Sequence, residues 1–210
     1  MGLRAVVFDY GMVLTGPPNR GAHDELVRIT GLPVERFEAL YWADRHAYDL
    51  GRLSGIEFWR KFATEAELSL SPAVLDELND WDARMWTRYN PRMLAWQQRL
   101  KERGLKTAIL SNIGDHVLEN MKREFTWLNR FDVLVWSYQL EIAKPDPAIY
   151  KYALKKLGVA PGEALFLDDK IENIEAAQAL GIRSLQFTTV DKLRADLIAV
   201  GLDAELPLPE

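Results

Sequence analysis

The sequence has no cysteine among its 210 residues, and it has no long apolar run. The lack of cysteine excludes disulfides, thiol nucleophiles and zinc–thiolate sites. No segment approaches the roughly 18 consecutive apolar residues that a membrane-spanning helix needs, and the first ten residues do not form a secretory signal pattern. We therefore expect a cytoplasmic protein with no membrane partner.

A surplus of positive charge is also missing. The chain has 26 lysines and arginines against 31 acidic residues, which gives a net charge of −5. Proteins that bind nucleic acid usually carry a basic patch and a high isoelectric point, so we expect no nucleic-acid partner. Apolar residues make up 48% and charged residues 27%, which are ordinary values for a globular protein with one sizeable core.

Five short apolar segments are predicted to be buried strands. Their apolar residues are continuous rather than alternating, as in a parallel sheet that is covered on both faces. Helical patterns separate most of them, including residues 145–157, 171–180 and a helix that starts at Asn90-Pro91 and stops near Gly104. This alternation predicts a doubly wound α/β fold. The predicted strands are residues 4–8, 106–110, 133–136, 164–167 and 183–187.

The segment between the first two predicted strands differs from the rest of the chain, because it contains no strand pattern. Four helices are predicted in it, at residues 22–30, 33–50, 54–68 and 72–89. Ser54 and Glu57 have the spacing of a capping box at the start of the third helix. We therefore predict an α/β core made of residues 1–15 and 90–210, with an inserted all-helical cap at residues 16–89.

Chemically reactive side chains occur where four of the predicted strands end. They are Asp9, the pair Ser111-Asn112, Lys144 after a short lead, and the pair Asp168-Asp169. Ligands of open α/β sheets bind at the carboxyl ends of the strands, so these groups are expected to converge. Carboxylates hold Mg²⁺, the ammonium neutralises phosphate oxygens, and a carboxylate in line with phosphorus can act as a nucleophile. The set suits phosphoryl transfer.

These motifs, in this order and at these strand ends, resemble the haloacid dehalogenase (HAD) superfamily. The helical insert resembles that superfamily's type-1 cap. The second half of the chain is similar to the branch that contains glucose-1-phosphate-type sugar phosphatases and the N-terminal phosphatase domain of soluble epoxide hydrolase. The segments that carry the resemblance are 110–112 (LSN), 144–150 (KPDPAIY) and 166–169 (FLDD), followed by Asn173.

The resemblance implies a Mg²⁺-dependent phosphatase that hydrolyses a small phosphorylated metabolite, such as a sugar phosphate, through an aspartyl-phosphate. Asp9 is then the nucleophile and a metal ligand. The backbone of Gly11 contributes a further ligand and part of the phosphate site. Ser111 holds a phosphate oxygen with Asn112 beside it, and Lys144 neutralises charge between nucleophile and phosphate.

The acid pair after the fourth strand completes the implied metal site. Asp169 is expected to bind Mg²⁺ directly, and Asp168 directly or through water. Asn173 is expected to orient this loop.

One position departs from the common family pattern. A second aspartate, which acts as general acid, usually lies two residues after the nucleophile, but here Gly11 occupies that place. Loss of a general acid costs on the order of 10²–10⁴ in rate. Three explanations remain open: a cap residue such as His23, Asp24 or His46 supplies the proton, the leaving group needs none, or turnover is slow. His116 is a weaker candidate for substrate contact.

Three other functions compete with the phosphatase. A 2-haloacid dehalogenase would use the same aspartate to attack carbon, but it needs no metal and does not require Asp168-Asp169. A phosphomutase normally relies on the general acid that Gly11 replaces. A phosphometabolite-binding module with little turnover is supported by Gly11 alone, and Asp9 and Lys144 argue against it.

Overall fold

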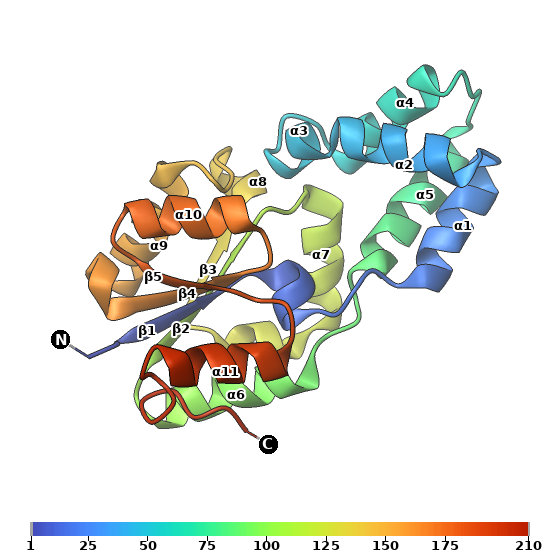
Figure 1. The fold of residues 1–210 in the computed structure, drawn as a ribbon. Helices are drawn as coiled ribbons and strands as arrows, with labels where there is room; N and C mark the ends of the chain where they lie inside the picture. Colours follow the sequence, from blue (N-terminus) through green and yellow to red (C-terminus); the bar gives the residue numbers. More distant parts are fainter. Residues whose placement is uncertain (1, 210) are drawn as a thin grey trace.

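The computed structural model of the protein describes residues 2–209 and has a five-stranded sheet at its centre (Figure 1). The strand order is β3-β2-β1-β4-β5, and every neighbouring pair is parallel. This confirms the predicted doubly wound α/β fold, and each strand ends within one residue of its predicted boundary. The strands are β1 (Ala5–Phe8), β2 (Lys106–Ser111), β3 (Val133–Trp136), β4 (Ala164–Asp168) and β5 (Arg183–Gln186).

Helices cover both faces of the sheet, with α9 and α10 on one face and α6 and α11 on the other (Figure 1). None of the helices within residues 2–209 is long and apolar enough to cross a lipid bilayer. The elements of this part are α6 (Pro91–Glu102), α7 (Asp115–Glu124), α8 (Ser137–Leu140), α9 (Pro147–Leu157), α10 (Ile171–Ala179), α11 (Val190–Ala199) and the short 3₁₀ turns η2 (Thr126–Arg130) and η3 (Pro161–Glu163).

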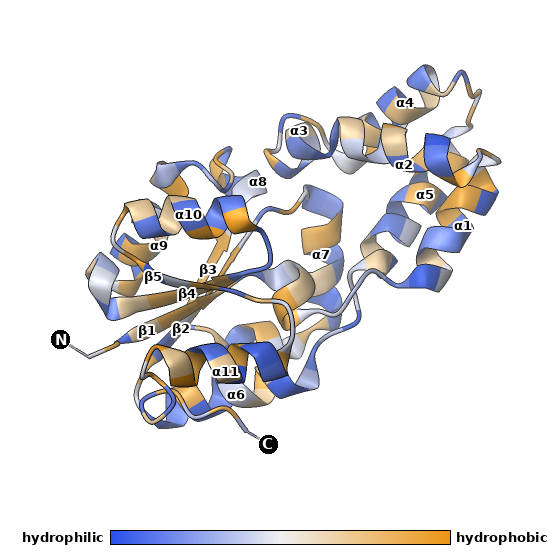
Figure 2. Ribbon diagram, in the orientation of Figure 1, coloured by the Kyte–Doolittle hydropathy of each residue, from blue (hydrophilic) through white to orange (hydrophobic). Residues whose placement is uncertain are grey.

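The two faces of the central strand β1 take part in two separate cores. Ala5 and Val7 pack in the cluster beneath α9 and α10, whereas Val6 and Phe8 pack in the cluster on the other face. Successive side chains of a strand point to opposite faces, so a strand buried on both faces needs apolar residues at every position. Figure 2 shows this concentration of apolar residues in the strands. The burial of β1 fixes the place where the chain reaches Asp9.

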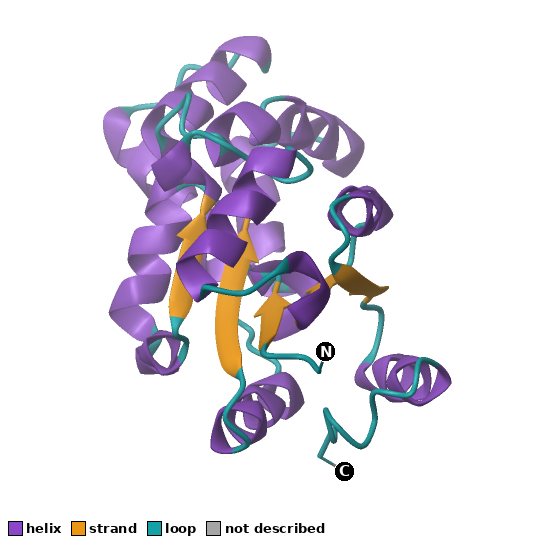
Figure 3. Ribbon diagram, turned by 90° about the vertical axis from the view of Figure 1, so that its left-hand side faces the viewer, coloured by secondary structure: helices purple, strands orange, loops and turns teal. Residues whose placement is uncertain are grey.

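The insert between β1 and β2 is helical, as the sequence predicts. Figures 1 and 3 show its helices gathered at one end of the molecule, on the side toward which the strands point. The capping box of Ser54 and Glu57 is present. The helices are α1 (Arg20–Thr30), α2 (Val34–Ala43), α3 (Arg45–Asp49), α4 (Gly55–Glu65) and α5 (Pro72–Met85).

The single helix predicted at residues 33–50 is wrong, because the chain breaks at Asp44. That residue leaves helical geometry (φ −111°, ψ 6°), and α3 begins after it. The break turns Arg45 inward, where its Nη1 lies 2.9 Å from Oδ1 of the fully buried Asp82 in α5. Burial of this ion pair outweighs the local preference for one continuous helix.

The two connections between the insert and the sheet run side by side. Thr15 and Tyr89 form an isolated antiparallel bridge, and the Asn90 amide donates to the Leu14 carbonyl at 2.7 Å. The insert therefore leaves and rejoins the sheet at one place. This arrangement agrees with the predicted division of the chain, which remains a prediction: a core of residues 1–15 and 90–210 and a cap of residues 16–89.

Candidate active site

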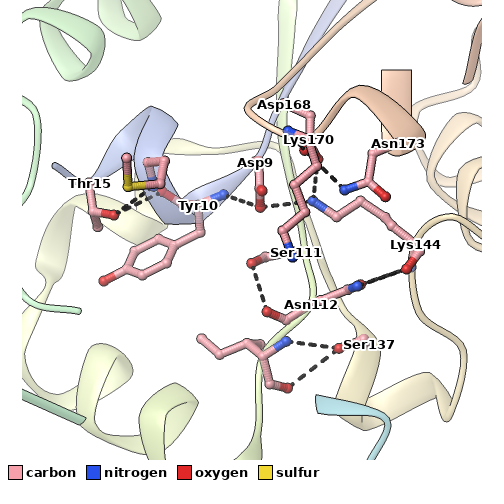
Figure 4. Close-up of polar contacts among 12 residues, drawn as sticks. Asp9, Tyr10, Thr15, Ser111, Asn112, Ser137, Lys144, Asp168, Lys170 and Asn173 are labelled. Carbon is pink, nitrogen blue, oxygen red and sulfur yellow. Dashed lines mark hydrogen bonds and ion pairs between the residues drawn. The ribbon is translucent and has the colours of Figure 1, made fainter. Parts of the chain in front are cut away.

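Asp9 lies directly after β1, at the carboxyl end of the sheet, and its carboxylate accepts a hydrogen bond from the Tyr10 amide at 2.7 Å. A wide turn, η1 (Tyr10–Leu14), follows it. Thr15 closes this turn: its amide donates to the Tyr10 carbonyl at 2.9 Å, and its hydroxyl accepts from the Met12 amide at 3.2 Å. Met12 is held at φ 61°. Figure 4 shows Asp9, Tyr10 and Thr15 in this arrangement at the edge of the sheet.

Lys144 brings a buried positive charge to Asp9. Its Nζ lies 2.9 Å from Asp9 Oδ1 and 2.6 Å from Asp168 Oδ2 (Figure 4). The side chain of Asn112 holds the Lys144 backbone. Its Nδ2 donates to the Lys144 carbonyl at 2.9 Å, and its Oδ1 accepts from the Lys144 backbone amide at 2.8 Å. The Lys144–Pro145 peptide is cis, and α9 begins at Pro147 rather than at the predicted residue 145.

Asp168 and Asp169 differ in how far their carboxylates are already engaged. Asp168 is fully buried, and its Oδ1 accepts from the Lys170 amide at 2.9 Å and from Asn173 Nδ2 at 3.0 Å, while Oδ2 faces Lys144. Asp169 is half-buried, and within the described residues no other side chain bonds its carboxylate. Asp169 is therefore the acid of this pair that is free to bind a ligand.

The charges at this site shift one another's pKa. Burial raises the pKa of Asp9 to about 7, although the ammonium of Lys144 opposes the shift. Burial by itself lowers the pKa of Lys144, but Asp9 and Asp168 hold it above its usual value. Burial, together with the neighbouring Asp168, also raises the pKa of Asp169. Three carboxylates around one ammonium leave an excess of negative charge, and such an arrangement favours a further cation.

The donor atoms fit a divalent metal ion. Asp9, Asp168 and Asp169 each offer one carboxylate oxygen, and these oxygens lie within 4.8 Å of one another. Mg²⁺ prefers oxygen ligands and is usually held by one or two carboxylates plus water and substrate oxygens. With Asp168 occupied by three donors, Asp9 and Asp169 are the carboxylates best placed to bind it.

Ser111 and Gly11 border the same edge of the sheet. Ser111 is the buried last residue of β2, and its one hydroxyl bond among the described residues is a long contact of 3.4 Å to the Asn112 carbonyl. Gly11 has open space around it, because an added Cβ would meet no atom within 4 Å. Its backbone (φ −60°, ψ 136°) suits any residue. Position 11, where the family usually has its general acid, therefore carries no side chain and has room for an added Cβ.

The histidine and acid candidates from the cap are engaged elsewhere or point outward. His23 Nε2 lies 2.5 Å from Glu38 of α2, and Asp24 and His46 are exposed. His116 is the second residue of α7, and its Nε2 lies 2.9 Å from Asp80 of α5. Among the described residues, no hydrogen bond or ion pair joins any of these four to Asp9.

Sequence reasoning missed Thr15 and Ser137. Thr15 lies six residues after Asp9, and the wide turn brings it back to Tyr10 and Met12. Ser137 directly follows β3, and the rule that strand ends carry the ligand groups would have found it. Its hydroxyl accepts from the Ile113 amide at 2.9 Å, which ties together the segments after β2 and β3.

Known proteins resemble this chain over most of its length. The model of the haloacid dehalogenase-like hydrolase family matches residues 3–181. Phosphatase MT3486 of Mycobacterium tuberculosis is 31% identical over 190 residues, which cover 88% of this chain and 87% of that protein. (S)-2-haloacid dehalogenase 1 of a Pseudomonas species is 27% identical over 203 residues, covering 90% of this chain and 86% of that one.

A solved structure shares the fold. A HAD family enzyme of Bacteroides thetaiotaomicron, in complex with magnesium and inorganic phosphate, has a TM-score of 0.76 at 22% identity and covers 90% of this chain and 96% of its own. At this identity the likeness concerns the fold alone. The relatives include enzymes for both phosphorus and carbon substrates, so the chemistry has to be argued from the site.

Proposed function

The chain belongs to the haloacid dehalogenase-like hydrolase family, and we propose that within this family the hydrolase is a Mg²⁺-dependent phosphatase of a small phosphorylated metabolite. The observation that carries the proposal is the unengaged carboxylate of Asp169 beside the Asp9–Lys144 pair. A second acid, free and close to the nucleophile, gives a divalent cation two anionic ligands. Attack on carbon would leave that acid without a role.

In the proposed first step, an Asp9 carboxylate oxygen attacks phosphorus in line with the leaving oxygen. The P–O bond to the leaving group breaks, and an aspartyl-phosphate forms on Asp9. Asp9 and Asp169, with Asp168 direct or through water and the Gly11 carbonyl, would hold Mg²⁺, which neutralises the phosphate oxygens when it is bound. Lys144 and Ser111 bind further phosphate oxygens, and Asn112 and Asn173 keep Lys144 and Asp168 in place.

In the second step, water attacks phosphorus, releases inorganic phosphate and restores the Asp9 carboxylate. The leaving oxygen in step one needs a proton, and the water in step two must lose one, which the released phosphate takes up as hydrogen phosphate when no side chain accepts it. Gly11 can do neither, and none of the described histidines contacts Asp9. We therefore infer that the preferred substrates have a leaving oxygen of low basicity, as an anomeric sugar phosphate or an acyl phosphate has.

Dehalogenation of a small 2-haloacid is the second candidate, since the chain is similar to (S)-2-haloacid dehalogenase 1. That reaction forms an ester between Asp9 and carbon and expels halide without a metal. The buried excess of carboxylates disfavours it, because two uncompensated acids would repel the carboxylate of the haloacid.

The direct test measures phosphate release from an aryl phosphate with Mg²⁺ and with a chelator, alongside chloride release from 2-chloropropionate. The proposal expects phosphate release that disappears with the chelator and no chloride release. Chloride release without metal would make the protein a dehalogenase. Tight phosphate binding without turnover in any metal would make it a binding module. A panel of phosphorylated metabolites then identifies the substrate.

A further inference from the structure

The end of helix α3 lies against the edge of the sheet that carries the site. The Ser137 hydroxyl donates to the Asp49 carbonyl at 2.5 Å, although the two residues are 88 positions apart. Gly51, at φ 75°, lies so close to α8 that an added Cβ would be 2.8 Å from the Tyr138 carbonyl oxygen. Residues 48–51, called here the cap tip, therefore contact the segment that follows β3.

The cap tip also contacts the segment that follows β2. The fully buried ring of Tyr48 packs on Gly114, where an added Cβ would lie 2.1 Å from the Tyr48 Cζ atom. No side chain fits between them at that distance. Residues 111–114, called here the Ser111 loop, thus have the cap tip directly on their last residue and the proposed phosphate ligand Ser111 at their first.

Ser137 joins the cap tip and the Ser111 loop through a single hydroxyl. Ser137 is fully buried. Its hydroxyl accepts a hydrogen bond from the Ile113 amide at 2.9 Å and donates one to the backbone carbonyl of Asp49. The Ile113 carbonyl lies 3.5 Å from the same hydroxyl. If the cap tip moves away, the hydroxyl retains a nearby alternative acceptor within the Ser111 loop.

From the Ser111 loop, hydrogen bonds continue to the nucleophile. Asn112, next to Ile113, makes two hydrogen bonds to the backbone of Lys144. Lys144 in turn pairs with Asp9 at 2.9 Å. These contacts, together with the covalent chain between them, link the Asp49 carbonyl of the cap to the carboxylate that is proposed to attack phosphorus. Figure 4 shows the part of this path from Ser137 to Asp9.

On the cap side of this contact, Asp49 belongs to a set of ion pairs within the cap. Arg45 Nε lies 3.2 Å from the Asp49 carboxylate, and Arg45 is itself held by the buried Asp82. Burial raises the pKa of Asp49, and Arg45 and then Lys170 from the core oppose that rise.

We propose that Ser137 is a positioning residue that couples the seating of the cap on the core to the geometry of the Ser111 loop and Lys144. With the cap tip seated, Ser137 bonds Asp49 and holds the Ile113 amide. Without it, the hydroxyl turns to the Ile113 carbonyl and the Ser111 loop loosens. A substrate that binds only to an ordered Ser111 loop then also favours the seated position of the cap. This follows because coupling between two sites acts equally in both directions. The catalytic part of this proposal rests on the proposed phosphatase function.

The test uses hydrogen exchange on the whole protein and one substitution on each side of the contact. Gly51→Ala pushes the cap tip from Tyr138 and alters no core residue, and we expect exchange of the Ile113 amide to rise about three- to tenfold. Ser137→Ala alters the core, and we expect a similar rise for the Gly51 and Arg52 amides of the cap. These factors correspond to the loss of one ordinary hydrogen bond.

Ser184→Ala is the matched control, since Ser184 is also buried and its hydroxyl, within residues 2–209, bonds the nearby Ile182 carbonyl and no group of the cap. We expect no change in the cap or in the Ser111 loop. The proposal is overturned if Gly51→Ala changes exchange in the cap alone, or if Ser137→Ala resembles Ser184→Ala. Should Gly51→Ala not fold, the cap amides of Ser137→Ala decide the matter.

Kinetics separate this proposal from the proposed function. Because a smaller population of the seated state lowers apparent affinity, Ser137→Ala should raise KM three- to tenfold while kcat changes less. A three- to tenfold fall of kcat with an unchanged KM would argue against positioning through the cap. If the wild type hydrolyses no phosphate ester, the proposed function fails, and the exchange experiment still decides the coupling.

Discussion

The ammonium nitrogen of Lys144 lies 2.6 Å from Asp168, which makes Asp168 the structural partner of the lysine rather than the exposed ligand of the pair. Its other oxygen accepts from Lys170 and Asn173. Asp169, the next residue, keeps its carboxylate free of other side chains in the described part of the chain. Two adjacent acids thus have different tasks.

The first prediction separates these tasks. Asp168→Asn should lower the free energy of unfolding by about 3 kcal/mol, because it removes half of the compensation of a buried ammonium. Asp169→Asn should leave that free energy nearly unchanged. It should weaken Mg²⁺ binding by more than roughly 10–100-fold, which is the loss seen when a residue that only supports a metal ligand is replaced. Urea titration and calorimetry measure the two effects. Equal effects of both substitutions on stability would contradict this division.

The second prediction concerns the open space at Gly11. Gly11→Asp adds a Cβ that meets no atom within 4 Å, and it puts a proton donor where the reaction lacks one. A general acid contributes on the order of 10²–10⁴ to the rate, and it matters most when the leaving oxygen is basic. Activity on alkyl phosphates should therefore rise more than activity on aryl phosphates, as the ratio of their kcat/KM values shows.

Gly11→Asn is the control for that experiment. Asparagine has nearly the same size as aspartate, but its side-chain amide does not act as a general acid. It should leave the ratio of alkyl to aryl activity near the wild-type value. An equal gain on both substrates with Gly11→Asp would mean that another acid already works in the site.

The third prediction follows from the buried Asp9. Its pKa is about 7 in the folded protein, raised mainly by burial, against 3.8 for an unperturbed aspartate. Between these pH values the folded state binds a proton that the unfolded state releases, so stability falls as pH rises. The full shift corresponds to about 4 kcal/mol, and the loss should occur between roughly pH 4 and 7.

Asp9→Asn removes this titrating carboxyl while the chain keeps its other titratable side chains, so the difference between the two proteins reports Asp9 together with its effect on Lys144. In metal-free protein, the stability of the wild type relative to Asp9→Asn should decline across that pH window, and saturating Mg²⁺ should reduce the decline by stabilising the carboxylate. A stability difference that does not vary with pH would show that Asp9 is not held in a desolvated place.

The sheet and most of the site residues follow from the sequence, because local patterns specify them. Continuous apolar runs predict β1 to β5, and the rule for parallel strand ends brings Asp9, Ser111, Lys144 and Asp168 together. Both features depend on residues close in sequence to the strands they describe.

Features that long-range packing determines were not predictable in the same way. The break at Asp44 exists because Arg45 reaches Asp82 in another helix, and nothing near residue 44 signals that partner. The different engagement of Asp168 and Asp169 depends on Lys144, 24 residues away. The contact of Ser137 with Asp49 joins segments 88 positions apart. Helices α8 and α11 were also missed.

The central claim is that the Asp9 carboxylate becomes bonded to phosphorus, and chemical trapping tests it most directly. Protein quenched during turnover of an aryl phosphate with Mg²⁺ is treated with borohydride, which reduces an acyl phosphate of aspartate to homoserine, and then mapped by mass spectrometry. Because Gly11 provides no base for the second step, the intermediate should accumulate. We predict homoserine at position 9 only; turnover with no conversion there, or conversion at another aspartate, would contradict the account.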